Sequence, residues 1–315
     1  MWIRRVSLVL IAALVVLTTS SGVGWLPSAY DPNDFGSNQS TGIPGLEIPF
    51  TGAPGSIIRH AGFSLLYNEA HEQASWVAYE LTSGETQKRF ERTDRFVPDM
   101  KVSEGSSTGA DYARSGYDRG HLAPAGDMAW SATAMAESFY FSNISPQLPG
   151  FNRGIWKRLE EQVRTWAVEY QSVYIVTGPV LNPGLPAIGP NRVSVPSHFY
   201  KVILDYTGPD FRAIGFIMPN AASGDPLKEF AVSIDEVERI TGLNFFPLLP
   251  DDEEEQIESE LCTACWAWEI GSAGAPGVIQ RAGGSAQCTG TTASGKRCRR
   301  MTSNPNQRCY QHGGK

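Results

Sequence analysis

An arginine, a glycine and a histidine stand next to one another at Arg119, Gly120 and His121. A guanidinium can hold phosphate oxygens through two parallel hydrogen bonds, and an imidazole can take a proton from water near neutral pH. A glycine between them lets the backbone turn, so that both side chains can face one pocket. The three residues therefore indicate attack on a phosphodiester, although the same tripeptide also occurs in ordinary turns.

A second polar segment contains Asn152 and Glu160, both on a predicted helix. The carboxamide oxygen of Asn152 is a hard donor, chemically apt for a divalent ion such as magnesium. Asn152 also stands where the helix is predicted to begin, and asparagine is a common N-cap, so both roles are open. Glu160 comes about 80 degrees further round the helix and ~12 Å along it. It should face the same side without sharing the inner coordination shell, whereas Glu161 should face solvent.

Together these segments resemble the DNA/RNA non-specific endonucleases, the ββα-metal nucleases that include mitochondrial endonuclease G. The resemblance covers residues 56–250. It also rests on residues 62–67, 76–81, 92–99, 142–147, 151–160, 176–180 and 195–201, which follow the family's order.

The resemblance implies a role for each residue of the predicted site. His121 would be the general base, Asn152 the metal ligand, and Glu160 the carboxylate that holds metal-bound waters. Arg119 would brace a phosphate, and Arg92 matches the family's upstream arginine, with Arg95 as the competing choice. The implied cofactor is Mg²⁺, with Mn²⁺ as a possible replacement, and the implied substrates are DNA and RNA. A homodimer and an inhibitor protein are possible partners.

Strand patterns surround these motifs at residues 76–81, 173–176, 199–206 and 211–218. Helical spacing of apolar residues predicts one helix over 152–170 and another that starts at Ser233 and stops before Gly242. Without a regular βαβ rhythm, these elements predict an α+β fold with a mixed, mainly antiparallel central sheet and a ββα-metal finger. Asn143, Gln147 and Asp118 should shape the site, and His198 should pack or hydrogen-bond rather than react.

The chain has 315 residues and a net charge of −7, which is unfavourable for binding a polyanion. Its acidic residues, however, are concentrated in residues 251–255. Basic residues flank the predicted site, although some of them should belong to solvated helix faces: Lys88, Arg89, Arg92, Arg95, Arg114, Arg119, Arg153, Lys157, Arg158 and Arg164.

The N-terminus has the pattern of an export signal, in which Arg4 and Arg5 precede the apolar run 6–17. That run is shorter than the ~20 residues of a membrane span, so a cleaved signal peptide over residues 1–22 is favoured over an uncleaved anchor. The sequence thus predicts a secreted or periplasmic protein with no stable membrane span after cleavage. Residues 23–55 are rich in Gly, Pro, Ser and Asn, and are predicted to be a linker.

The C-terminal segment is too short to build its own core. After an acidic and then Gly-rich linker over 251–286, residues 287–315 contain Cys288, Cys298, Cys309 and His312 at a spacing that fits a tetrahedral zinc site. It resembles short Cys₃His modules appended to other nucleases. Disulfides among these cysteines or with Cys262 and Cys265 are the alternative in an oxidising compartment, and a disordered tail is the third possibility.

The sequence therefore predicts an exported, metal-dependent endonuclease that cuts DNA and RNA with little sequence specificity. The alternative is a nucleic-acid-binding protein with the nuclease fold, or a toxin or interaction protein, whose specificity lies in the C-terminal tail.

Overall fold

The computed structural model describes residues 43–52, 55–208 and 211–268, together with 286, 287, 289–291, 297, 301 and 302. The chain divides into two compact units, Met1–Thr263 and Ala264–Lys315. In the second unit β12 (Ala286–Gln287) pairs with β13 (Met301–Thr302). Cys288, Cys298, Cys309 and His312 lie outside the described residues, so the zinc site remains a prediction. Cys262 and Cys265 are disulfide-bonded, which is one of the states expected for them.

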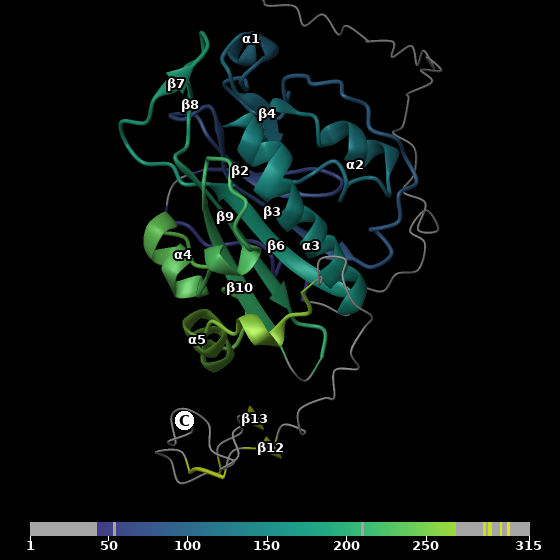
Figure 1. The fold of residues 1–315 in the computed structure, drawn as a ribbon, viewed down its shortest axis with the longest axis vertical. Coiled ribbons are helices and arrows are strands. Elements are labelled where there is room, and N and C mark those ends of the chain that lie inside the picture. The colour runs from purple at the N-terminus through teal and green to yellow at the C-terminus, as the bar shows by residue number, and fades with distance from the viewer. Residues whose placement is uncertain are drawn as a thin grey trace, which may run out of the picture. The chain divides into compact units, whose positions relative to one another are not determined.

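The first unit is built on a seven-stranded sheet in the order β1-β2-β3-β6-β9-β10-β11, antiparallel in every pairing (Figure 1). The α+β prediction and the four predicted strands are confirmed. The strands are β1 (Ile57–Arg59), β2 (Ser64–Asn68), β3 (Gln73–Thr82), β6 (Ser172–Pro179), β9 (His198–Asp205), β10 (Arg212–Pro219) and β11 (Ala231–Val232).

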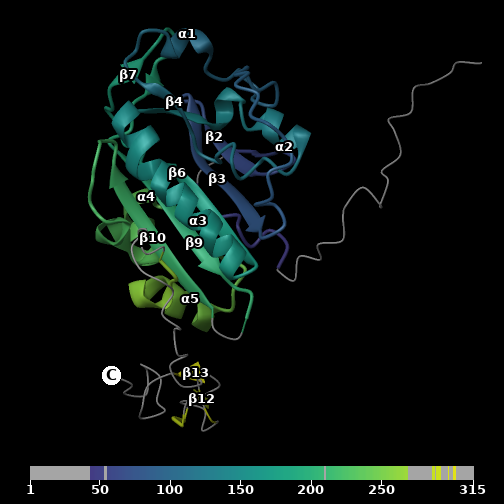
Figure 2. The same cartoon turned by 45° about the vertical axis from the view of Figure 1, so that its right-hand side comes forward.

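The central strands are apolar along both faces because helices cover the sheet on both sides. Side chains alternate between the two faces of a strand, so neighbours on β9 point to opposite sides. Phe199 packs on Trp156, which stands at the start of α3 (Lys157–Glu169). Tyr200 and Val202 instead join a core cluster with Val237 of α4 (Ile234–Thr241), and that cluster also includes α5 (Asp251–Ser259). Figure 2 shows α3 lying along one face of the sheet.

Three stretches differ from or refine the predicted elements. Leu46, in the segment predicted to be a linker, is fully buried in the core. Ile257 is also buried there, on a helix within the predicted acidic linker. The helix that starts at Ser233 is confirmed: the Ser233 hydroxyl accepts the Glu236 N–H at 3.3 Å, and Gly242 ends the helix with a left-handed φ of 70°.

The finger that carries the predicted site consists of β4 (Asp118–His121), β5 (Ile144–Gln147) and α3, with β4 and β5 antiparallel. Between β5 and α3 comes η2 (Phe151–Trp156), an irregular helical segment in which Gly154 leaves helical geometry at φ −108° and ψ −109°. The helix predicted over 152–170 is therefore kinked at its first turn. The remaining short elements of the first unit are α1 (Gly109–Tyr112), α2 (Ala132–Glu137), η1 (Phe141–Asn143), β7 (Ala187–Ile188), β8 (Val193–Ser194) and η3 (Leu227–Phe230), and η4 (Thr263–Cys265) follows α5.

No helix among the described residues is long and apolar enough to cross a membrane.

Candidate active site

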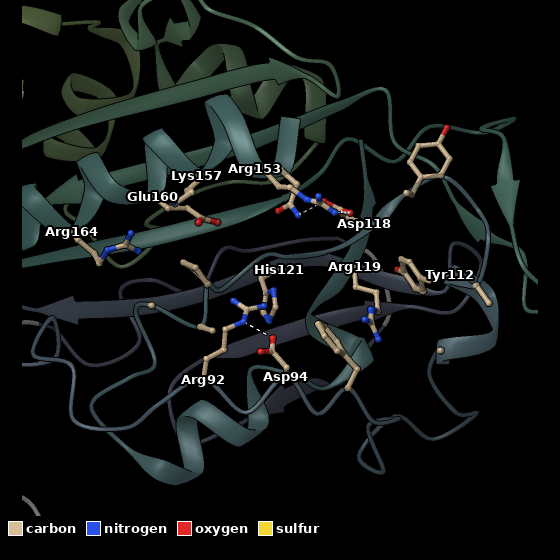
Figure 3. A pocket seen from close by; sticks show the side chains of 18 residues that line it. Arg92, Asp94, Tyr112, Asp118, Arg119, His121, Arg153, Lys157, Glu160 and Arg164 are labelled. Atoms are coloured by element: carbon tan, nitrogen blue, oxygen red, sulfur yellow. Dashed lines mark hydrogen bonds and ion pairs between the residues drawn. The ribbon is translucent and has the colours of Figure 1, made fainter. Parts of the chain in front are cut away.

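A cleft of about 860 Å³ is lined by residues of β4, of α3 and of the segment that precedes α1. Figure 3 shows its two walls: Lys157 and Glu160 come from the α3 side, and Arg92 and Arg119 lie opposite. The cleft brings together all five residues predicted to act on the phosphodiester. They are Arg92, Arg119, His121, Asn152 and Glu160.

His121 ends β4 and is 7 % exposed. The Phe139 ring packs edge-on against its imidazole with centroids 4.9 Å apart, and Phe96 lies at 5.5 Å. Its Nε2 atom is buried and has no hydrogen-bond partner among the described residues. Burial, aided by the positive charges of Arg92 and Arg119, lowers the pKa of His121 to about 3. The imidazole is therefore neutral at pH 7 and can accept a proton.

The glycine between the arginine and the histidine has a different purpose from the predicted one. Gly120 lies within a strand, and a Cβ added to it would come within 2.2 Å of the Gln147 side chain. The residue is needed for close packing of β4 on β5 and not for a turn. Asn143 supports the same region, because its amide accepts the Ala123 N–H at 2.9 Å and donates to the Ala123 carbonyl at 2.9 Å.

Two arginines line the wall opposite α3, each over an aromatic ring. The Arg119 guanidinium lies 4.0 Å from the centre of the Phe96 ring. Arg92 lies 5.0 Å from the centre of Phe139 and donates to Asp94 at 2.6 Å. Stacking on a ring restricts a guanidinium while leaving its N–H groups free for an anion. Arg95, the competing choice for the upstream arginine, does not line the cleft.

Asn152 does not cap a helix, contrary to one of its two expected roles. The N-cap of η2 is Gly150, and no side chain caps it. The Asn152 Nδ2 atom instead donates to Asp118 at 3.0 Å, and Arg153 holds the same carboxylate with two bonds of 2.8 and 2.6 Å. Burial raises the pKa of Asp118, but the bonds from Arg153 and Asn152 outweigh it and hold that pKa below its usual value. Asp118 therefore fixes the amide nitrogen, which leaves the Asn152 carboxamide oxygen for the cleft.

Glu160 faces the same cleft two turns further along the helix, and Glu161 is exposed, both as predicted. Burial raises the pKa of Glu160 to about 7, against the opposing effect of Lys201. Lys201 is 1 % exposed, and its ammonium lies 4.8 Å from the centre of the Trp156 ring, without a hydrogen-bond partner among the described residues. Burial also lowers the pKa of Lys201 to about 8, while Glu160 raises it.

A further charged network that sequence reasoning missed borders Glu160. Asp127 is 1 % exposed and accepts hydrogen bonds from the Tyr79 hydroxyl at 2.8 Å and from Arg164 at 2.7 Å. Arg164 lines the cleft beside Glu160 (Figure 3). Lys201 could have been recognised from the sequence as a site candidate, because a lysine inside an apolar strand pattern needs a charged partner. Arg164 was expected among the basic residues that flank the site, but its pairing with Asp127 gave no signal, because these two residues are far apart in sequence.

His198 lies outside the cleft, half-buried, with its Nδ1 atom 3.1 Å from the Ser197 hydroxyl. This geometry fits the hydrogen-bonded role that was expected for it.

The cleft fits a single divalent ion. The free amide oxygen of Asn152 is a hard donor of the kind that Mg²⁺ prefers, and the Glu160 carboxylate lines the same cleft, where it could accept hydrogen bonds from waters around such an ion. The neutral imidazole of His121, which lines this cleft, is suited to accept a proton from water.

Comparison with known proteins identifies the family to which the chain belongs. Residues 45–252 match the DNA/RNA non-specific endonuclease family. The chain is 37 % identical to mitochondrial nuclease EXOG of Danio rerio, over 79 % of this chain and 76 % of that one. It is 36 % identical to human mitochondrial endonuclease G, over 65 % of this chain and 72 % of that one. A solved EndoG/EndoGI complex, described as showing the mechanism of EndoG inhibition, contains a chain 34 % identical with a TM-score of 0.59, over 63 % of this chain and 88 % of that one.

These relatives contradict the expected secreted or periplasmic location, because both nucleases are named as mitochondrial. An arginine pair followed by a short apolar run does not by itself distinguish one targeting segment from another. The predicted signal peptide, residues 1–22, lies outside the described residues.

Proposed function

The chain belongs to the DNA/RNA non-specific endonuclease family, and from this membership we propose that it cuts both nucleic acids with His121 as general base and one Mg²⁺ ion held by Asn152. The family depends on a divalent metal ion, and Mn²⁺ would suit the same oxygen donors. The observation that carries the proposal is the neutral imidazole of His121, which lines the same cleft as Arg92, Arg119 and Asn152.

His121 would take the proton of the attacking water. Its low pKa keeps the imidazole neutral in the free protein, but would make it a weak base if nothing changed. A phosphodiester entering the cleft brings negative charge close to the ring and offsets the charges of Arg92 and Arg119. Substrate binding should therefore raise the pKa of His121 and strengthen the base at the moment it is needed.

Arg119 and Arg92 would hold the non-bridging phosphate oxygens and stabilise the charge that develops in the transition state. The divalent ion, when bound, supplies Lewis-acid stabilisation of the phosphate and of the departing oxygen. Asn152 would present its amide oxygen to that ion, and Glu160 would accept hydrogen bonds from the waters around it. Contacts to the phosphate backbone position a nucleic acid without reading its bases, which explains low sequence specificity.

The test is cleavage of circular duplex DNA and of structured RNA by the full chain, with MgCl₂ or EDTA. We expect Mg²⁺-dependent cutting of both substrates, lost in His121→Ala. Glu160→Gln should also lose most activity, whereas Glu161→Gln, a neighbouring exposed residue with the same charge change, should keep it. Equal losses in the two glutamate variants, or full activity of His121→Ala, would contradict the assignment.

A protein inhibitor is a further proposed partner, supported by the solved EndoG/EndoGI complex. A homodimer and a zinc ion in residues 287–315 remain predictions.

A further inference from the structure

The cleft extends beyond the residues proposed to act on the phosphodiester. Its volume of about 860 Å³ is far more than one phosphate group fills. Figure 3 shows Glu160 towards one side of the cleft and Tyr112 towards the other, with Arg119 between them. Ala113 and Tyr117, which follow Tyr112 in the chain, also line the cleft. This end has an uncharged lining, so it suits a part of the substrate other than the phosphate.

The two tyrosines at this end differ in what surrounds their rings. Tyr112 is 6 % exposed, its ring stacks on Phe141 with centroids 5.7 Å apart, and its hydroxyl donates to the Ile144 carbonyl at 3.4 Å. Tyr117 is half-buried. Among the described residues its ring has no aromatic neighbour, and its hydroxyl has no hydrogen-bond partner. Tyr112 is therefore part of the packing, whereas the Tyr117 side chain is available to a ligand.

Tyr117 is also placed at a useful distance from Arg119. It immediately precedes β4 and stands two residues before Arg119, and both side chains line the cleft. Side chains two residues apart along an extended strand point to the same face, ~6.4–6.8 Å from each other. A phosphate group and the base of the adjoining nucleotide are separated by a comparable distance. One nucleotide of a strand can therefore reach from Arg119 to Tyr117.

We propose, on the basis of the nuclease function proposed above, that Tyr117 stacks on an unpaired base next to the phosphate held by Arg119. Every base presents a π-face, so stacking does not select a sequence. In a duplex the bases are already stacked and paired, and extruding one of them costs free energy. An unpaired strand presents its bases without that cost. Tyr117 therefore favours single-stranded DNA and RNA loops over duplexes.

The Tyr117 hydroxyl offers a competing mode of binding, because it can donate a hydrogen bond to a phosphate oxygen. The two modes respond differently to the same changes. Stacking requires the ring of Tyr117 and a base on the substrate. A hydrogen bond to phosphate requires the hydroxyl and is indifferent to the base. Removal of the ring, removal of the hydroxyl and removal of the base therefore separate them.

The experiment measures binding of two labelled strands by fluorescence anisotropy, to the full chain carrying His121→Ala in EDTA so that neither strand is cut. One strand is oligothymidylate, and the other is an abasic strand of the same length. Both carry the same phosphate charges, so their difference in affinity reports on the bases. A base stacked on an aromatic side chain raises affinity about 5- to 150-fold. We expect the parent to bind oligothymidylate at least fivefold more tightly than the abasic strand.

Three variants in the same background decide the outcome. Tyr117→Ala should lower the ratio of the two affinities at least fivefold, and Tyr117→Phe, which keeps the ring, should change it less than twofold. Phe50→Ala is the control, because it removes an aromatic side chain that is 64 % exposed and does not line the cleft. In the chain with His121 intact, Tyr117→Ala should also lower the ratio of kcat/KM for single-stranded over duplex DNA at least fivefold.

Four results would overturn the stacking role. They are an unchanged affinity ratio in Tyr117→Ala, an equal loss in Tyr117→Phe, which would assign binding to the hydroxyl, no preference of the parent for the strand with bases, and no binding of either strand. The binding readout is separate from cleavage. A chain that prefers the strand with bases but cuts no nucleic acid would contradict the proposed nuclease function and leave the stacking role intact.

Discussion

Replacing Asp118 should weaken metal binding, because this carboxylate orients the proposed metal ligand. Asp118 accepts a 3.0 Å bond from the Asn152 amide nitrogen, and this bond is what keeps the amide oxygen turned towards the cleft. A hydrogen bond to a charged group contributes about 1.5–3 kcal/mol. Its loss in Asp118→Ala should therefore raise the Mg²⁺ concentration for half-maximal activity about 10- to 100-fold.

Two further variants separate orientation of Asn152 from simple loss of charge. Asp118→Asn keeps a neutral acceptor and should cost only a few-fold. Arg153→Gln removes the strongest partner of Asp118 but leaves its bond to Asn152. The Arg153 side chain is 73 % exposed, so solvent screens its ion pair with Asp118, and the metal requirement should change less than about fivefold.

The assay is the initial rate of plasmid nicking as a function of MgCl₂ concentration at saturating DNA, with circular dichroism to confirm folding. We expect the Mg²⁺ requirement to increase most in Asp118→Ala, less in Asp118→Asn and least in Arg153→Gln, with much smaller changes in the rate at saturating metal. If Arg153→Gln shifted the metal requirement as far as Asp118→Ala, the ion pair and not the Asn152 bond would be responsible. An unchanged requirement in Asp118→Ala would refute the orienting role altogether.

Three other predictions concern the buried charges. The pKa of Glu160 is about 7 and its ionised form should be active, so kcat/KM should rise with pH through about 7. Because Lys201 lowers the pKa of Glu160, Lys201→Met should move this rise in the pH profile to higher pH. A rise at the same pH in the variant would exclude coupling of the two groups. Tyr79→Phe should lower the free energy of unfolding, measured by urea denaturation, by about 1.5–3 kcal/mol, because the buried Asp127 carboxylate loses a hydrogen-bond donor. A smaller decrease would show that a water molecule replaces the tyrosine hydroxyl. The pKa of His121 is about 3 in the folded protein and near 6.5 in the unfolded chain, so the unfolded chain binds a proton first as the pH falls. The free energy of unfolding should therefore decrease below pH ~6.5, by about 2 kcal/mol between pH 7 and 5. His121→Asn should lack this part of the pH dependence.

The sequence was sufficient to predict four strands of the sheet, β3, β6, β9 and β10, and to identify the motif residues that line the cleft. Strands such as β6 and β9 are mainly apolar segments between turn residues, and such a local pattern can be recognised in the sequence without knowledge of the fold. The helix that carries Glu160 was also predictable, but its kinked first turn was not. Asn152 is a good N-cap by residue type, yet its amide bonds to Asp118, a strand residue that is its neighbour only in the folded chain.

The buried charges could not be predicted for the same reason. The sequence does not show that Asp127 accepts hydrogen bonds from Tyr79 and Arg164. Nor does it show that the Glu258 carboxylate lies close to two carboxylates of another helix. Each of these contacts joins elements that only the antiparallel sheet and its two covering layers bring together. Composition likewise gave no sign that Leu46, in a segment rich in Gly and Pro, would be fully buried.

Separation of charge within the fold explains how a chain of net charge −7 can act on a polyanion. The cleft is lined by five basic side chains and three carboxylates, so its potential is positive even before a metal ion binds. One of those carboxylates, Asp118, is neutralised by Arg153, and another, Glu160, is half-protonated near pH 7. The acidic run Asp251–Glu255 belongs to α5, whose contacts are with α4 and β10 on the face of the sheet opposite α3. Surface charges more than about 10 Å apart are largely screened at ~0.1 M salt, so the local charge of the cleft, and not the sum over the chain, governs nucleic-acid binding.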